Sequence, residues 1–385
     1  MGDNNREAAW SQRAGASQRA GAQYAAALAT RLARIAPGDL DVVHLCSTAA
    51  EAVEVALTLA QRAQGLRRSG VAYAARSAHG KTRGALSGPG SMRSRSPLRR
   101  VRGDVQVPFG DADALADALC RRRIGTVILE TVQGGADPPP PDYLHDVRRL
   151  CDEHGALWIA DEAACGVGRT GRFFAFEHAD VVPDLVTLAT SLGGGVAGVG
   201  AVIARGSVHR RACPDAASAI PLGAFSGTAE ACCAALQTLA VLYAEDLIGN
   251  AERTGRYLLR RLEGLRQCYP QLVTDVRGRG LMVGVHLAGI NPAATGPRHR
   301  VRSARHGAAA GDSPRGYLAS VIGTLLLAEH GVLVAFTDDD ADVLRLEPPL
   351  TIRPDHVDHF VDALDELLSR GPRRLAHDYL RVMHT

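Results

Sequence analysis

The chain has 385 residues, 46% of them hydrophobic, and is therefore long enough to bury a large core in one or two domains. Its 44 basic and 41 acidic residues nearly balance and are scattered, which argues against a nucleic-acid partner. No apolar run approaches the roughly 18 residues of a membrane span, the N-terminus does not resemble a signal peptide, and the eight cysteines show no metal-ligand spacing, so we expect a cytoplasmic protein without a membrane segment or a metal.

The first part of the chain alternates between helical and strand-like patterns. Residues 1–20 are polar and are predicted to be a flexible N-terminus. Thr48 and Glu51 have the spacing of a capping box, which predicts the start of a helix. The alternation indicates an α/β domain with a mostly parallel sheet over residues 21–245. Strand-like runs cover 42–46, 71–74, 126–129, 157–160, 185–188 and 199–204, and helical patterns cover 23–35, 143–153 and 228–244.

The pattern changes after residue 245 and indicates a smaller α+β domain over residues 246–385. Within it, residues 289–316 are rich in Gly, Ala, Pro, Arg and His without periodicity, which predicts a long mobile loop. Helices are expected near 251–265, 318–329 and 356–368, and strands near 273–277, 281–286, 332–335 and 343–346.

Lysine is almost absent from the chain. Lys81 is the only lysine, and the other 43 of the 44 basic residues are arginines. A guanidinium group stays protonated and cannot act as an amine nucleophile. Any reaction that needs a lysine must therefore use Lys81 or a lysine from another chain.

An apolar strand that ends in two carboxylates, Leu157–Glu162, marks a sheet edge of the kind where α/β proteins bind ligands. Further motifs are Ala36–Leu40, Ala50–Glu54, His79–Thr82, Glu130–Gly134, Leu150–Gly155, Gly166–Gly171, Val182–Leu188, Val276–Met282 and Leu344–Leu350. In this order and spacing they resemble the class III aminotransferases of the ornithine/acetylornithine type, over roughly residues 25–370. The resemblance implies the fold type I architecture of pyridoxal phosphate (PLP) enzymes. It also implies a dimer with its active sites at the subunit interface.

The sequence departs from this family at the catalytic lysine. In the family the lysine precedes a Gly-rich turn, and the matching stretch here is Thr187–Gly195, with Thr190 at the lysine position. A threonine cannot form an imine with the cofactor or carry the substrate's α-proton, so ordinary transamination is predicted to be absent. Other cofactor contacts are replaced as well. The family cradles the cofactor phosphate with a Ser-Gly-Ala/Thr turn, and the matching Thr48, Ala49 and Ala50 lack its glycine. At the other matching positions, Ala78 replaces a ring-stacking aromatic residue, Ala163 and Ala164 replace Val-Gln, and Ala224 replaces a threonine given by the partner subunit.

Several polar residues remain as candidates for chemistry. The resemblance implies that Asp161 pairs with the cofactor's ring nitrogen, and the alternative is a strand-end carboxylate that caps nearby amides. His79 is either a general acid or base or a histidine bonded to a loop carbonyl. Glu130 and Glu162 are candidate buried carboxylates, for which structural pairing is an equal explanation. Arg345 stands where the family often binds the substrate carboxylate, with an ion pair as the alternative.

Three functions are consistent with this sequence. The first is a non-catalytic partner or regulator of an active homologue, in a homodimer or heterodimer, with no bound cofactor. The second is a PLP-independent enzyme of specialised metabolism that uses His79, Asp161, Glu162 and Thr190 on a small-molecule substrate. The third is an aminotransferase that uses pyridoxamine phosphate or holds PLP in an atypical way. Lysine-free enzymes of this fold place a histidine at the lysine position, and Thr190 offers no comparable base.

Overall fold

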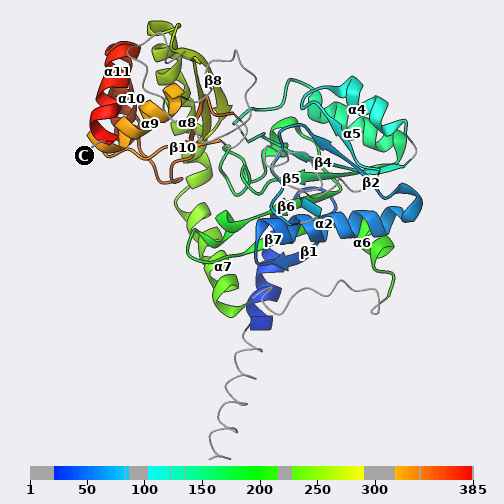
Figure 1. Ribbon diagram of the computed structural model, residues 1–385. Coiled ribbons are helices and arrows are strands. Elements are labelled where there is room, and N and C mark those ends of the chain that lie inside the picture. The colour runs from blue at the N-terminus through cyan, green and yellow to red at the C-terminus, as the bar shows by residue number, and fades with distance from the viewer. Residues whose placement is uncertain are drawn as a thin grey trace, which may run out of the picture. The chain divides into compact units, whose positions relative to one another are not determined.

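The computed structural model describes residues 21–82, 84–85, 103–121, 123–134, 136–215, 228–289, 317–337 and 340–383. The chain divides into two compact units (Figure 1). The first comprises Met1–Gln133, Pro139–Gly168 and Arg172–Leu247, and the second Gly134–Pro138, Arg169–Gly171 and Ile248–Thr385. Ala224, residues 1–20 and nearly all of the predicted mobile loop lie outside the described residues.

The first unit is built on a seven-stranded sheet. Its order is β1 (Leu40–Cys46), β7 (Gly200–Arg205), β6 (Leu185–Leu188), β5 (Leu157–Asp161), β4 (Ile124–Glu130), β2 (Gly70–Ala74) and β3 (Val105–Val107). The last five strands in this order are parallel to one another, and β7 runs antiparallel to both of its neighbours. The predicted mostly parallel sheet is therefore confirmed.

Helices cover both faces of this sheet. Figure 1 shows α2 (Ala49–Gln64) and α6 (Gly206–Ala212) on one face, and α4 (Ala112–Leu119) and α5 (Tyr143–His154) on the other. A helix over residues 21–35 and α7 (Ala229–Ala244) complete the unit. The predicted capping box of α2 forms only in part. Thr48 Oγ1 accepts from the Glu51 amide at 3.1 Å, but the Glu51 carboxylate accepts from the Ser47 amide at 2.8 Å and not from the amide of Thr48.

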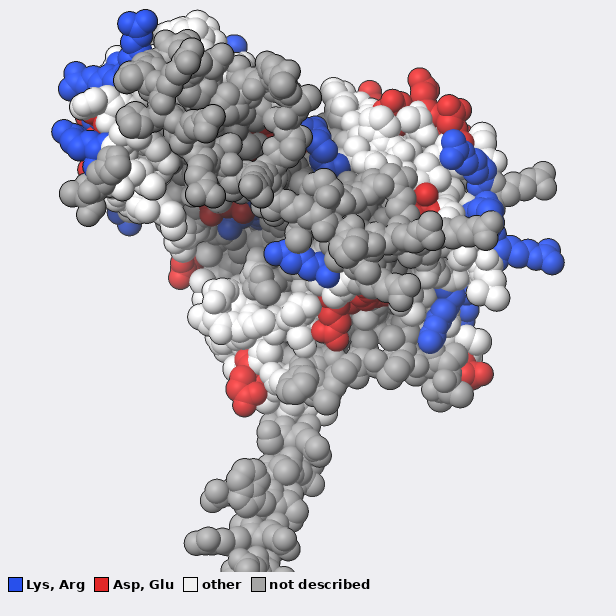
Figure 2. Space-filling model, in the orientation of Figure 1, with Lys and Arg blue, Asp and Glu red and all other residues white. Residues whose placement is uncertain are grey.

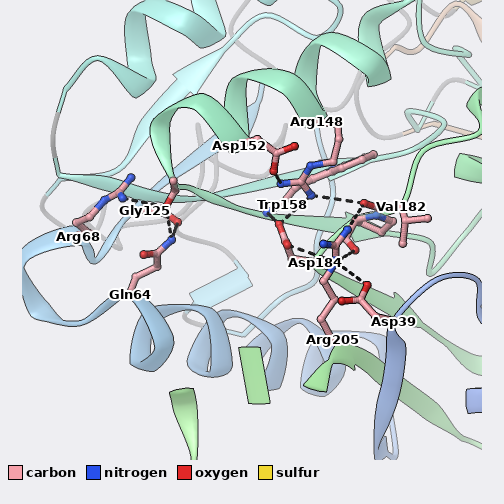
Figure 3. Close-up of polar contacts among 12 residues, drawn as sticks. Asp39, Gln64, Arg68, Gly125, Arg148, Asp152, Trp158, Val182, Asp184 and Arg205 are labelled. Carbon is pink, nitrogen blue, oxygen red and sulfur yellow. Dashed lines mark hydrogen bonds and ion pairs between the residues drawn. The ribbon is translucent and has the colours of Figure 1, made fainter. Parts of the chain in front are cut away.

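Ion pairs and hydrogen bonds close the sheet edge at the amino ends of β5 and β6 (Figure 3). Asp184, just before β6, accepts from the Trp158 amide at 2.8 Å and from Arg148 Nη1 at 2.9 Å. Arg68 donates to the carbonyls of His154 and Gly155 at 2.7 and 2.8 Å. Because these polar groups bond to one another, we interpret the amino-terminal edge of the sheet as having a structural role. A ligand site is therefore expected at the opposite edge, where the strands have their carboxyl ends.

The second unit contains an antiparallel sheet in the order β10 (Ala335–Phe336), β11 (Val343–Leu346), β9 (Met282–Leu287) and β8 (Val273–Arg279). Its helices are α8 (Leu247–Cys268), α9 (Tyr317–His330), α10 (Pro354–Ser369) and α11 (Gly371–Met383). Leucine, valine and isoleucine side chains from α8, α9, α10 and the sheet form one buried core. This is a smaller α+β unit.

The observed division differs from the expected one, because two short segments from the first half of the chain join the second unit. Arg169 donates to the carbonyl of Leu281, and its own carbonyl accepts from the Leu281 amide at 2.9 Å. In the other segment, Asp137 pairs with Arg277 at 2.9 Å. These long-range bonds explain why a boundary drawn from local patterns misses the two segments.

The described surface and helices give two further findings. Basic and acidic side chains both occur on each unit in the face shown in Figure 2, in keeping with the balanced composition. Among the described residues no single helix is long and apolar enough to cross a membrane, although α7 and α8 pass that test when taken together as a broken pair.

Two glycines of α8 give a matched test of the second unit's packing. A Cβ added at Gly255 would lie 2.0 Å from the Gly280 carbonyl oxygen, whereas one at Gly264 would meet no atom within 4 Å. Gly255→Ala is therefore expected to lower the free energy of unfolding by about 1–3 kcal/mol. Gly264→Ala is expected to raise it by up to about 1 kcal/mol, because alanine favours the helix. Equal denaturation midpoints by circular dichroism would contradict this packing.

Candidate active site

The candidate site is centred on Asp161, the last residue of β5. Because β4, β5 and β6 are parallel, their carboxyl ends meet at one edge of the sheet. Asp161 Oδ2 lies 2.7 Å from His79 Nδ1, and Oδ1 accepts from Thr187 Oγ1 at 2.7 Å and from the Ala163 amide at 3.1 Å. The His79 and Asp161 side chains are only 1% and 3% exposed. The structure thus brings His79 and Asp161 into contact, whereas the sequence identified them only as separate candidates.

Each member of this pair favours the charged form of the other. Burial by itself disfavours a protonated imidazole, but the hydrogen bond and charge of Asp161 outweigh it and raise the pKa of His79. Burial likewise opposes the carboxylate, yet the bonds from His79 and Thr187 hold the pKa of Asp161 below its usual range. Both directions describe an imidazolium–carboxylate pair. The remaining ring nitrogen of His79, Nε2, is buried and has no hydrogen-bond partner among the described residues.

Glu162 faces a different part of the first unit. Its two oxygens accept from the Ala175 and Phe176 amides at 2.7 and 2.9 Å, at the start of the short helix η3 (Ala175–Ala179). Burial raises the pKa of Glu162 to about 7. Since both oxygens hold backbone amides, we leave Glu162 out of the proposed chemistry.

The loop after β2 carries His79 to Asp161 and is held from two sides. The carboxylate of Glu130, at the end of β4, accepts from the Ala78 amide at 3.2 Å. Gly80 has a φ of +128°, and a Cβ added there would lie 2.8 Å from Ala50 Cβ. A glycine is therefore required at residue 80. The loop consequently packs on the first turn of α2, next to the turn expected to cradle a phosphate.

The start of α2 keeps the features of an anion site. The amides of Ala49 and Ala50 occupy the first two helical positions, which have no acceptor within the helix. The positive end of the helix dipole adds to their attraction for a phosphate. Three other residues stand at positions where the family is expected to contact its cofactor. Ala78 and Ala164 are exposed and Ala163 is half-buried.

The remaining sequence-predicted residues lie as follows. Thr190 opens the short helix η4 (Thr190–Gly193), just beyond the end of β6, which pairs with β5. Lys81 is exposed on the loop after β2, two residues beyond His79. Arg345 belongs to the second unit, where its Nη2 pairs with Glu347 at 2.5 Å.

Sequence reasoning missed Thr187 as a site residue. Its hydroxyl donates to Asp161 and is fully buried. The available signal was a single polar residue within the otherwise apolar strand Leu185–Leu188.

Comparison with known proteins defines the family. The sequence profile described as "Aminotransferase class-III" matches residues 13–368. Aminotransferase PigE from Serratia sp. (strain ATCC 39006) is 34% identical over 367 residues, which cover 89% of this chain and 43% of that protein. The chain thus spans less than half the length of this curated relative.

Solved structures agree with that match. A transaminase from the marine bacterium Virgibacillus has a TM-score of 0.76 and 27% identity, covering 89% of this chain and 78% of that one. An amine transaminase from an uncultivated Pseudomonas species, in its PLP-bound form, has a TM-score of 0.75 and 27% identity, covering 92% and 81%. The chain therefore belongs to the class III aminotransferase family and has the fold type I architecture, as the sequence motifs predicted.

These relatives bear on the expected cofactor. The sequence led us to expect that the chain binds none, but one of the similar structures contains PLP. The expectation of an empty site is not supported by this comparison, and the family points to PLP or pyridoxamine phosphate as the ligand to test.

Proposed function

We propose that this chain is a class III aminotransferase homologue that does not transaminate alone and acts as a non-catalytic partner or regulator of an active homologue. The observation that carries the proposal is the position of the chain's single lysine. Lys81, the only lysine, follows β2, whereas the turn after β6 begins with Thr190. Without an amine at that turn, the chain lacks both the imine-forming group and the base that moves the substrate proton.

The preserved scaffold supports a role that depends on the fold rather than on turnover. The seven-stranded sheet and the buried His79–Asp161 pair are intact. A homodimer or a heterodimer is the expected assembly for such a role. All eight cysteines are free, which fits a reducing compartment such as the cytoplasm.

We propose that the residues at this edge do not fit a covalently attached PLP. Asp161 and the α2 amides could still hold a ring nitrogen and a phosphate. The turn after β6 offers no amine, since Thr190 occupies it. Any cofactor should therefore bind without a covalent link and exchange freely.

Absorbance spectroscopy with PLP tests this directly. The purified chain is expected to develop no near-visible aldimine band when PLP is added, and borohydride followed by peptide mapping is expected to leave Lys81 unmodified. Thr190→Lys is the matched variant, because it restores an amine at the turn after β6 and should yield a trappable adduct at residue 190. A stoichiometric adduct on Lys81 of the unmodified chain would overturn the proposal.

A second measurement addresses the partner role. The chain is mixed with a purified, active class III aminotransferase from the same organism and examined by native mass spectrometry. Formation of a heterodimer that changes the active partner's turnover supports regulation. A self-sufficient homodimer with its own turnover rules it out.

The buried Nε2 of His79, which has no hydrogen-bond partner in the part of the chain that the structure describes, favours a second candidate, a PLP-independent enzyme that reuses this pocket on a small molecule. An imidazole held by a carboxylate is a common general acid–base arrangement. The discriminating result is the combination of no PLP binding, no heterodimer, and an activity that His79→Gln abolishes.

A further inference from the structure

Two histidines far apart in the sequence meet at the edge of the first unit's sheet. His44 lies in β1 and His209 in α6, and His44 Nε2 is 3.2 Å from His209 Nδ1. Both residues are half-buried. Neither belongs to the candidate active site, and their separation of 165 residues explains why spacing in the sequence predicted no metal.

The geometry of the two rings matches that of two ligands on one metal ion. Two imidazole nitrogens bound to a tetrahedral ion at about 2.1 Å stand about 3.4 Å apart, and their ring centroids about 5.2 Å apart. The observed separations are 3.2 Å between nitrogens and 5.1 Å between centroids. If the two rings pointed straight at each other, as in a linear hydrogen bond, the same 3.2 Å between nitrogens would place their centroids about 5.5 Å apart. The ring axes are therefore splayed, a geometry that both a bent hydrogen bond and two ligands on one ion adopt.

The exposure of the two residues also suits metal binding. Because both residues are half-exposed, water can reach the remaining coordination positions.

We propose that His44 and His209 form a two-histidine binding site for a borderline divalent cation such as Zn²⁺, completed by water. Imidazole ligands favour Zn²⁺, Ni²⁺ and Cu²⁺ over the hard cations Mg²⁺ and Ca²⁺. A bound ion would join the edge strand β1 to α6. By mass action it would also stabilise the first unit.

Another cluster with metal-ligand chemistry does not carry such a proposal. Glu329, His330 and Glu366 have ligand atoms within 4.8 Å of one another. Arg370 pairs with both carboxylates at 2.7 Å, so a cation is already present there. His44 and His209 contact each other, and neither forms an ion pair with a described residue.

Zinc titration of the tag-free chain, by isothermal calorimetry and thermal melting, tests the site. One Zn²⁺ per chain and a rise in the melting temperature are expected. His44→Ala and His209→Ala should each weaken zinc binding at least tenfold, whereas His377→Ala, which removes a histidine with 79% side-chain exposure on α11, should leave it unchanged. If either variant binds zinc as tightly as the unmodified chain, the site is refuted. It is also refuted if Mg²⁺ raises the melting temperature as much as Zn²⁺ does.

Chemical modification of histidines in the unmodified chain gives a second test, which does not depend on the folding of any variant. Diethyl pyrocarbonate modifies accessible neutral histidines, and peptide mapping locates the modified residues. Zinc is expected to protect His209 in the unmodified chain but not His377. The same modification of His209 with and without zinc would show that the two histidines share only a hydrogen bond.

Discussion

Transamination by the purified chain is expected to be at least about 10⁴-fold slower than by an active class III homologue, because loss of the proton-transferring group alone costs about 10²–10⁴-fold and loss of the imine adds to it. The proposed function assigns this loss to Thr190, at the turn after β6. The assay follows the first half-reaction, in which an amino donor converts added PLP to pyridoxamine phosphate. PLP without protein gives the background.

The Thr190→Lys variant separates two reasons for inactivity. If only the amine is missing, this variant should exceed the unmodified chain by a large factor. If the changes at Ala49, Ala78 and Ala164 have also removed cofactor affinity, the gain should appear only at high PLP concentration. Turnover by the unmodified chain at a rate typical of the family would contradict the proposed function.

Removal of Asp161 is expected to have the largest effect on stability among single changes in the site. Asp161→Ala leaves the His79 imidazolium buried without its counter-charge, and breaking a buried ion pair in this way costs about 3–5 kcal/mol. The measurement is the free energy of unfolding in denaturant. The double variant with His79→Leu serves as the control, because it removes both charges and should be less destabilised than Asp161→Ala alone.

The pH dependence of that effect follows from the two pKa directions. The pKa of Asp161 is lowered on folding, so its contribution is present above its unfolded pKa of about 3.9 and is lost as the pH falls through the folded value. The pKa of His79 is raised, so its contribution is complete below about 6.5 and is lost as the pH rises through the folded value. The destabilisation by Asp161→Ala should therefore be greatest between about pH 4 and pH 6.5. A difference that is constant from pH 5 to pH 10 would argue against an ion pair.

Much of the fold was predictable because buried strands of the large unit are mostly apolar runs. The run Leu157–Ala160 and the predicted strand Leu185–Leu188 coincide closely with β5 and β6. The elements missed are short or begin with unusual residues. Helix α4 has only eight residues, although Asp111 caps it through the Ala114 amide at 2.8 Å. Helix α11 begins with Gly371 and then a proline, a pair typical of turns but tolerated in the first turn of a helix.

The site was predictable only one residue at a time. A strand that ends in Asp161 indicates the edge of the sheet, and His79 is chemically suited to acid–base work. The bond between them joins residues 82 positions apart and depends on how the loop after β2 packs. Glu162 shows the same limit, since the sequence cannot reveal that its oxygens face the backbone of η3.

The close approach of Gly80 to Ala50 has a consequence for how this protein could change over evolution. A larger side chain at either position would push apart the first turn of α2 and the loop that carries His79. A mutation that enlarges residue 50 would thus disturb the partner of Asp161 at the same time. Residues 50 and 80 are therefore expected to stay small together, whatever happens at the neighbouring Ala49.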